Sequence, residues 1–98
     1  KESFRSHVIY SDDFGTSWKL GGVAPEDAVN ECEVAELSDG RLMLNMRSYK
    51  SGARVRQVAL SNDGGASFQD QRIDPTLIDP ICQASFRRYA WQSDAYPK

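Results

Sequence analysis

The 98-residue sequence predicts an all-β fold made of short antiparallel strands, and three observations support this. An eight-residue pattern, Ser-x-Asp-x-Gly-x-x-aromatic, occurs twice, as SDDFGTSW (residues 11–18) and as SNDGGASF (residues 61–68). Apolar-rich runs of strand length precede and follow each copy. No segment shows a helical period of adequate length. An apolar content of 40% is ordinary for a folded domain.

The expected strands flank the two copies of the pattern. HVIYS (7–11) enters the first copy and WKLGG (18–22) leaves it. RVRQVALS (54–61) enters the second copy and FQDQRI (68–73) leaves it. The run ICQASFRRYAW (81–91) is expected to begin another hairpin.

The clearest single element is the hairpin CEVAELSDGRLMLNMR (32–47). Asp39-Gly40 between two apolar-rich runs indicates a two-residue type I′ turn, because that turn needs positive φ at both central residues. Such a turn places Ser38 opposite Arg41. In the second strand of this hairpin, alternate residues are apolar and share one face. They are Leu42, Leu44 and Met46.

The order of these elements predicts a repeated four-stranded unit. Between the two copies the chain runs strand, loop (23–31, with Pro25), hairpin and strand, and a second loop with two prolines is expected at 74–80. Four short strands in about 50 residues are typical of a β-propeller blade. A propeller needs at least about four blades. The sequence therefore predicts a segment of about two blades from a larger propeller.

The repeated pattern itself predicts a tight structural turn between two strands. Its Ser ties the incoming strand, its Asp accepts backbone N–H groups, its Gly permits positive φ and its aromatic ring lies buried beneath the turn. These positions are Ser11, Asp13, Gly15 and Trp18 in the first copy and Ser61, Asp63, Gly65 and Phe68 in the second. A calcium loop is not favoured, because no Glu closes the loop as an EF-hand requires. No metal site is predicted.

Composition narrows the function classes. A net charge of −2 gives no reason to expect a nucleic-acid partner, and no apolar run approaches the roughly 18 residues of a membrane span. The chain has no initiator Met and begins inside an expected strand, which suggests a piece of a longer protein. Cys32 and Cys82 lie 50 residues apart. Two buried free thiols are favoured, and a bridge between equivalent places in neighbouring units is the alternative.

Glu31 and Arg47 are the candidate functional pair. The expected register brings them within about one residue of facing each other at the open end of the hairpin. From geometry alone this is a cross-strand ion pair on a solvated edge, worth at most about 1 kcal/mol. The alternative is a carboxylate and a guanidinium that converge on a ligand.

The residue types and their order in these segments favour the second alternative, a pair that converges on a ligand. The repeated pattern resembles the Asp-box of the sialidases (neuraminidases), which also occurs in sorting receptors and other propellers. NECEVAELSDGRLMLNMR (30–47) resembles the Glu-to-Arg hairpin of the exo-α-sialidases, especially the secreted bacterial enzymes and the lysosomal mammalian neuraminidase. DPICQASFRRYAW (79–91) resembles the start of that family's next blade. The resemblance covers nearly the whole chain and implies that residues 1–98 are part of a six-bladed sialidase-type propeller.

The resemblance also implies roles for three residues. Glu31 would polarise a tyrosine nucleophile, Arg47 would be one of three arginines that bind the carboxylate of sialic acid, and Gln83 would lie near the sugar-binding rim. Sialic acid carries its carboxylate at the anomeric carbon, so a neutral tyrosine avoids the repulsion that a carboxylate nucleophile would meet. Tyrosine has an ordinary pKa of about 10 and needs a neighbouring base. Neither a metal nor a cofactor is required.

The resemblance further implies sialylated glycans, glycoproteins or glycolipids as partners, and a secreted, periplasmic or lysosomal location. The family's nucleophilic tyrosine, acid/base Asp and two other arginines lie outside the matched segments, so this segment alone is expected to be inactive. None of the four tyrosines is surrounded by the residues that flank the family's nucleophilic tyrosine. Four arginines are expected to be solvated charges on strand faces. The tyrosines are Tyr10, Tyr49, Tyr89 and Tyr96, and the arginines are Arg54, Arg56, Arg87 and Arg88.

Two alternative functions remain at this point. One is a non-catalytic Asp-box propeller that binds protein or glycan, as a sorting receptor does. The other is a glycosidase on the same propeller with specificity for a different α-keto acid sugar. The Glu31–Arg47 hairpin distinguishes the first alternative from a sialidase, because a receptor blade has no reason to keep that pair.

Overall fold

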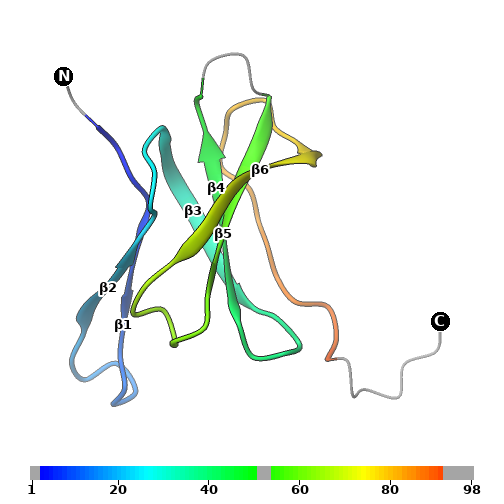
Figure 1. The fold of residues 1–98 in the computed structure, drawn as a ribbon. Coiled ribbons are helices and arrows are strands. Elements are labelled where there is room, and N and C mark those ends of the chain that lie inside the picture. The colour runs from blue at the N-terminus through cyan, green and yellow to red at the C-terminus, as the bar shows by residue number, and fades with distance from the viewer. Residues whose placement is uncertain (1–2, 51–53, 92–98) are drawn as a thin grey trace.

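The structure is a computed structural model that describes residues 3–50 and 54–91, and the strands in this part of the chain all pair antiparallel. One sheet pairs β1 with β2, and the other has four strands in the order β3-β4-β5-β6 (Figure 1). The strands are β1 (His7–Tyr10), β2 (Lys19–Val23), β3 (Val29–Glu36), β4 (Leu42–Ser48), β5 (Val55–Ser61) and β6 (Gln69–Ile78). The predicted all-β fold is confirmed.

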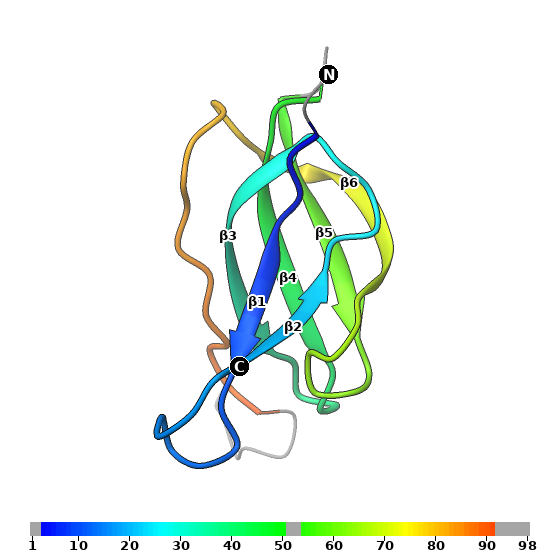
Figure 2. The same ribbon diagram turned by 90° about the vertical axis from the view of Figure 1, so that its left-hand side faces the viewer.

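The four-stranded sheet lies between two other parts of the chain. The β1–β2 hairpin packs on its first face, and the Gly22 N–H donates to the Gly65 carbonyl across this contact at 2.7 Å (Figure 2). The segment 79–91 crosses the second face, from a contact with Arg56 on β5 to contacts with Glu33 and Glu36 on β3. Each face therefore presents its own set of side chains to a different neighbour.

The core fills the first face. Leu44 and Met46 on β4 are fully buried and Leu42 packs against them, as the alternation in this strand predicted. Burying each such side chain contributes about 1.5–3 kcal/mol. The other buried members of this cluster come from the loop after β2, from β3, from β5 and from the second copy of the eight-residue pattern, which is called the second Asp-box below because of its resemblance. They are Ala24, Val29, Ala59 and Phe68.

The turn between β3 and β4 differs from the prediction. The Leu37 N–H donates to the Arg41 carbonyl at 2.7 Å, so the loop has three residues, and Leu37 rather than Ser38 lies opposite Arg41. Only Gly40 takes positive φ, at 90°. Asp39 keeps ordinary φ, and its carboxylate accepts the Arg41 N–H at 3.1 Å and Arg41 Nε at 2.9 Å. The two-residue type I′ turn was therefore wrong, because the Asp39 side chain stabilises a longer loop that demands positive φ of glycine alone.

Both predicted loops are shorter than expected. β3 already begins at Val29, which leaves 24–28 of the expected loop 23–31. β6 continues to Ile78 through Pro75, although 74–80 was predicted to be a loop. β6 has a neighbour on one side only in the described sheet, so the missing N–H of Pro75 costs little pairing there. No strand occurs within 79–91, contrary to the hairpin expected from residue 81.

Candidate functional site

The first Asp-box is a turn closed by its own side chains. Ser11 Oγ donates to Asp13 Oδ1 at 2.7 Å and accepts the Gly15 N–H at 2.8 Å. Ser17 donates twice to the Asp13 carboxylate, from its N–H to Oδ1 at 2.8 Å and from its Oγ to Oδ2 at 2.5 Å. Gly15 has φ 87°. The predicted roles of Ser, Asp and Gly in the turn are confirmed.

The second Asp-box repeats this arrangement. Ser61 Oγ donates to Asp63 Oδ1 at 2.8 Å, and Ser67 donates to the same carboxylate from both its N–H and its Oγ. The serine hydrogen bonds lower the pKa of Asp13 and of Asp63 to about 2. The role of the seventh position was missed from the sequence, although a Ser precedes the aromatic residue in both copies.

The two aromatic residues of the boxes have different surroundings. Phe68 is 7% exposed, so the predicted burial of its ring is confirmed, and the ring lies against Gly22 of β2. Trp18 is 59% exposed and donates from Nε1 to the Gly15 carbonyl at 3.2 Å, so its predicted burial was wrong. The difference arises because Phe68 faces the β1–β2 hairpin, whereas Trp18 is part of that outer hairpin.

We expect Asp13→Asn to lower the thermal stability of the full-length protein at neutral pH, because the amide accepts fewer of the donors of Ser11 and Ser17. The folded-state pKa of Asp13, about 2, lies below its ordinary value of 3.8. Its contribution is therefore complete above pH 3.8 and is lost as the pH falls towards 2. Thermal melts of both proteins should converge over that range. Asp12→Asn is the control, since the second box already carries Asn62 there; an equal effect of both changes would contradict this role.

Glu31 and Arg47 meet across β3 and β4, as the hairpin predicted. Arg47 Nη1 lies 3.7 Å from Glu31 Oε1, and their side chains are 30% and 53% exposed. The strand register is irregular between Val29 and Cys32, where Glu31 lies. The Asn30 side chain accepts the Glu31 N–H at 2.7 Å and so helps to fix this irregular stretch.

Arg47 has a hydrogen-bond donor that no group within residues 3–50 and 54–91 accepts. Its Nε is buried and has no partner in this part of the chain, and 3.7 Å to Glu31 is too long for a strong charge-assisted bond. A buried N–H without an acceptor is costly, and such groups deserve an explanation. The planar guanidinium can bind a carboxylate through two parallel N–H groups. The pair therefore offers an acceptor for a proton next to a donor for an anion.

The third candidate site residue is Gln83. It is exposed and follows the bend after β6, and among residues 3–50 and 54–91 it makes no hydrogen bond to Glu31 or Arg47. Tyr49 directly follows β4, as expected for an aromatic residue at a strand end. Its ring packs edge-on against that of Phe4, with the ring centroids 6.4 Å apart. Tyr96 lies outside the described residues.

The arginines are less uniform than predicted. Arg56 is 4% exposed and donates hydrogen bonds from all three guanidinium nitrogens to acceptors inside the protein, so its assignment as a solvated strand-face charge was wrong. Arg87 and Arg88 are exposed but belong to no strand. Arg88 donates to the Glu36 carbonyl at 3.1 Å, and its guanidinium lies over the Trp91 ring at 3.3 Å.

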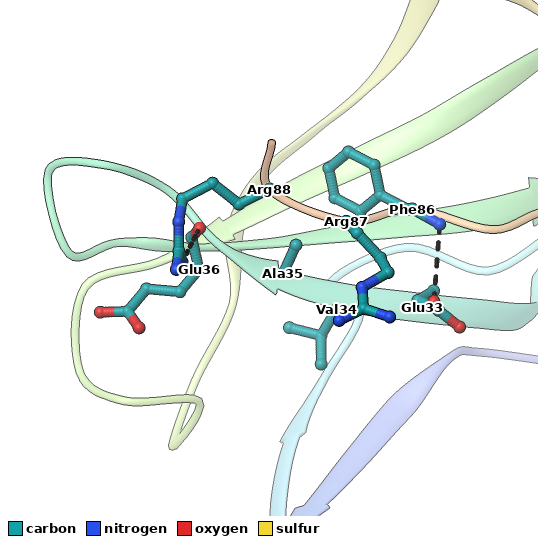
Figure 3. A pocket seen from close by; sticks show the side chains of 7 residues that line it. All are labelled: Glu33, Val34, Ala35, Glu36, Phe86, Arg87 and Arg88. Atoms are coloured by element: carbon teal, nitrogen blue, oxygen red, sulfur yellow. Dashed lines mark hydrogen bonds between the residues drawn. The ribbon is translucent and has the colours of Figure 1, made fainter. Parts of the chain in front are cut away.

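A shallow polar groove runs between β3 and residues 86–88 (Figure 3). The Phe86 N–H reaches Glu33 Oε2 at 3.5 Å across it. Its lining includes neither Glu31 nor Arg47, so it is separate from the candidate pair. The lining residues are Glu33, Val34, Ala35, Glu36, Phe86, Arg87 and Arg88.

The two cysteines are free thiols. Cys32 is partly buried, and this burial raises the pKa of its thiol. Cys82 is exposed. The structure thus favours free thiols over a bridge, although the expectation that both are buried was wrong for Cys82. Within residues 3–50 and 54–91, no three His, Cys, Asp or Glu side chains gather as metal ligands would, and no helix is long and apolar enough to cross a membrane.

The family follows from comparison with known proteins. A model described as "BNR repeat-like domain" matches residues 1–86. The chain belongs to the BNR repeat-like domain family. A crystal structure of a protein of unknown function from Dyadobacter fermentans matches with a TM-score of 0.58 and 28% identity, over 68% of this chain and 19% of that one.

Curated relatives of this BNR segment are sialidases, so the resemblance noted in the sequence is confirmed. It is 44% identical to a sialidase of Micromonospora viridifaciens over 88% of the segment and 13% of that protein. It is 38% identical to sialidase-3 and 42% identical to sialidase-4 of Mus musculus, in each case over 82% of the segment and over 20% and 16% of those proteins. The segment thus spans no more than a fifth of the length of these relatives.

Proposed function

We propose that this BNR segment is part of the propeller of a retaining exo-α-sialidase that releases terminal sialic acid from glycans, glycoproteins or glycolipids. The observation that carries the proposal is the Glu31–Arg47 pair, in which a carboxylate lies beside a guanidinium whose buried Nε–H has no acceptor among the described residues. The sialidases among the relatives support it. No cofactor or metal enters the proposed reaction.

The propeller part of the proposal rests on the repeat. Each Asp-box joins two antiparallel strands, β1 to β2 and β5 to β6. The second pair forms half of a four-stranded sheet, so we infer that the first pair is the equivalent half of a preceding blade. On this basis residues 1–98 form a partial sialidase-type domain within a six-bladed propeller.

Each residue of the pair has a separate chemical task. Arg47 binds the substrate carboxylate with charge-assisted hydrogen bonds and so orients the anomeric carbon. Glu31 accepts the phenolic proton of a tyrosine supplied elsewhere in the full-length protein, while the phenolic oxygen forms a bond to that carbon. The bond to the aglycone oxygen breaks, and an acid protonates the leaving oxygen. Water then gives a proton to the conjugate base of that acid and displaces the tyrosine oxygen, which regains its proton from Glu31, and two inversions retain the configuration.

Gln83 is the third proposed site residue, as a substrate-binding side chain at the rim. Its exposed amide is free to donate to and accept from sugar hydroxyl groups. It follows the bend at 79–82, whose Cys82 carbonyl is bound by a side chain from β5.

The direct test is hydrolysis by the full-length protein. We expect release of a fluorogenic aglycone from an α-sialoside, but not from the methyl ester of the same glycoside, which keeps the sugar and loses the charge that Arg47 binds. Equal hydrolysis of both would contradict the role of Arg47. A folded protein that hydrolyses neither but binds sialylated glycan or protein would favour the non-catalytic propeller.

A further inference from the structure

The second face of the four-stranded sheet holds a buried ion pair that the proposed reaction does not use. Arg56 on β5 is 4% exposed and Asp79, one residue beyond β6, is 2% exposed. Arg56 Nη1 lies 3.5 Å from Asp79 Oδ2. Removing two charges from water carries a large desolvation cost that attraction offsets only with good geometry and further hydrogen bonds. Stability alone is therefore a weak explanation for the pair.

Arg56 ties together three parts of the chain. From its place on β5 it donates from Nε to Asn45 Oδ1 at 2.6 Å, and from Nη2 to the Asn45 carbonyl at 3.4 Å, both on β4. It also donates from Nη1 to the Cys82 carbonyl at 2.7 Å. The rigid fork of the guanidinium reaches all of these acceptors at once, which a lysine ammonium has no geometry to do.

Asp79 fixes the same bend from the other side. Its Oδ1 accepts the Ile81 N–H at 3.0 Å and the Cys82 N–H at 3.2 Å. Its own N–H donates to the Arg54 carbonyl at 2.8 Å, which anchors it to the start of β5. Ile81 has φ 69°, a conformation that a β-branched residue adopts only when its surroundings hold it there. The bend is thus held by its contacts and not by its own backbone preference.

This bend lies beside the candidate pair. Met46 on β4 is opposite Gln57 on β5, and Arg47 and Arg56 are the next residues outward on the two strands, so they occupy neighbouring positions on one face. Asn45 and Cys82 accept hydrogen bonds from the Arg56 guanidinium, and Asp79 Oδ2 lies 3.5 Å from it without a hydrogen bond, whereas Arg47 has a buried Nε–H that finds no acceptor among the described residues. The arrangement leaves Arg47 rather than Arg56 available to an anion.

We propose that the Arg56–Asp79 pair is a positioning device that holds residues 81–83 against β5 and thereby fixes Gln83 next to the Arg47 site. Arg56 acts through this bend and does not touch the substrate. The identity of the ligand rests on the proposed sialidase function, but the positioning of the bend does not.

The test compares three variants of the full-length protein: Arg56→Lys, Gln83→Ala and the double variant. Misplacing a binding group by about 1 Å costs up to roughly 100-fold, so we expect Arg56→Lys to raise KM for the α-sialoside by roughly 10-fold with a smaller change in kcat. Because Arg56 acts through Gln83, the double variant should be no worse than the more impaired single variant. Arg54→Lys is the control, since the contact of Arg54 with the bend is made by its backbone carbonyl, which the substitution keeps.

Hydrogen exchange supplies a readout that needs no activity. Arg56→Lys should reduce protection of the Ile81 and Cys82 amides while leaving β4 and β5 protected. Multiplicative losses of kcat/KM in the double variant, or unchanged protection at the bend, would overturn the proposal. If the wild-type protein hydrolyses no α-sialoside, the proposed function fails, and the exchange result alone decides whether the pair positions the bend.

Discussion

Replacing Glu31 with Gln in the full-length protein is expected to lower kcat for an α-sialoside by roughly 10²–10⁴-fold, the range that general bases contribute. Gln keeps the size and polarity of the side chain but accepts no phenolic proton. KM should change little, because the carboxylate of the substrate is bound by Arg47 and not by Glu31. Steady-state kinetics with a fluorogenic α-sialoside measures both parameters.

The matched control for this change is Glu36→Gln. Glu36 lies on the same strand, is exposed, and contributes only its backbone carbonyl to the contact with Arg88. Its replacement should leave kcat unchanged. If Glu31→Gln left kcat unchanged, the proposed role of Glu31 as a base would be wrong. The Glu31–Arg47 pair would then be a surface ion pair that contributes at most about 1 kcal/mol to stability.

Replacing Arg47 with Ala should lower kcat/KM by roughly 30- to 4000-fold, because it removes the proposed charge pair between Arg47 and the substrate carboxylate. This range corresponds to the 2–5 kcal/mol commonly lost when one partner of a buried charge pair is truncated. Arg47→Lys should recover part of this loss, because the charge returns but the bidentate fork does not. The same kinetic assay, run with an α-sialoside over a wide concentration range, separates the loss of binding from any loss of kcat.

Two further measurements make the Arg47 result interpretable. Urea denaturation should show that Arg47→Ala changes the free energy of unfolding by no more than about 1 kcal/mol, since the ion pair with Glu31 is partly exposed. Arg72→Ala, at an exposed position on β6, should leave kcat/KM unchanged. If Lys at position 47 fully restored activity, a point charge would suffice and the proposed bidentate contact would be wrong.

The sequence already contained the parts of the site that depend on local chain geometry. Every side-chain bond of the two Asp-boxes joins residues no more than four apart, from Ser11 to Gly15 or from Asp63 to Ser67, so the repeated pattern was enough to predict the turns. Glu31 and Arg47 are also close along the chain and are joined by one hairpin. A one-residue error in the turn left them paired, because it moved the register without separating the strands.

The features that the sequence did not reveal depend on which layer covers which side chain. Trp18 and Phe68 occupy the same place in the repeat, yet within the described part of the chain only Phe68 has another sheet packed over it. Pro75 fits in a strand because that strand borders the described sheet. In the sequence, the position of Arg56 on β5 is one that a solvent-facing charge would also occupy. Arg56 is buried because the bend at 79–82 returns over the sheet and supplies the Asp79 carboxylate and the Cys82 carbonyl oxygen. Burial of a charge requires partners from distant segments, and the residue types along one strand do not specify them.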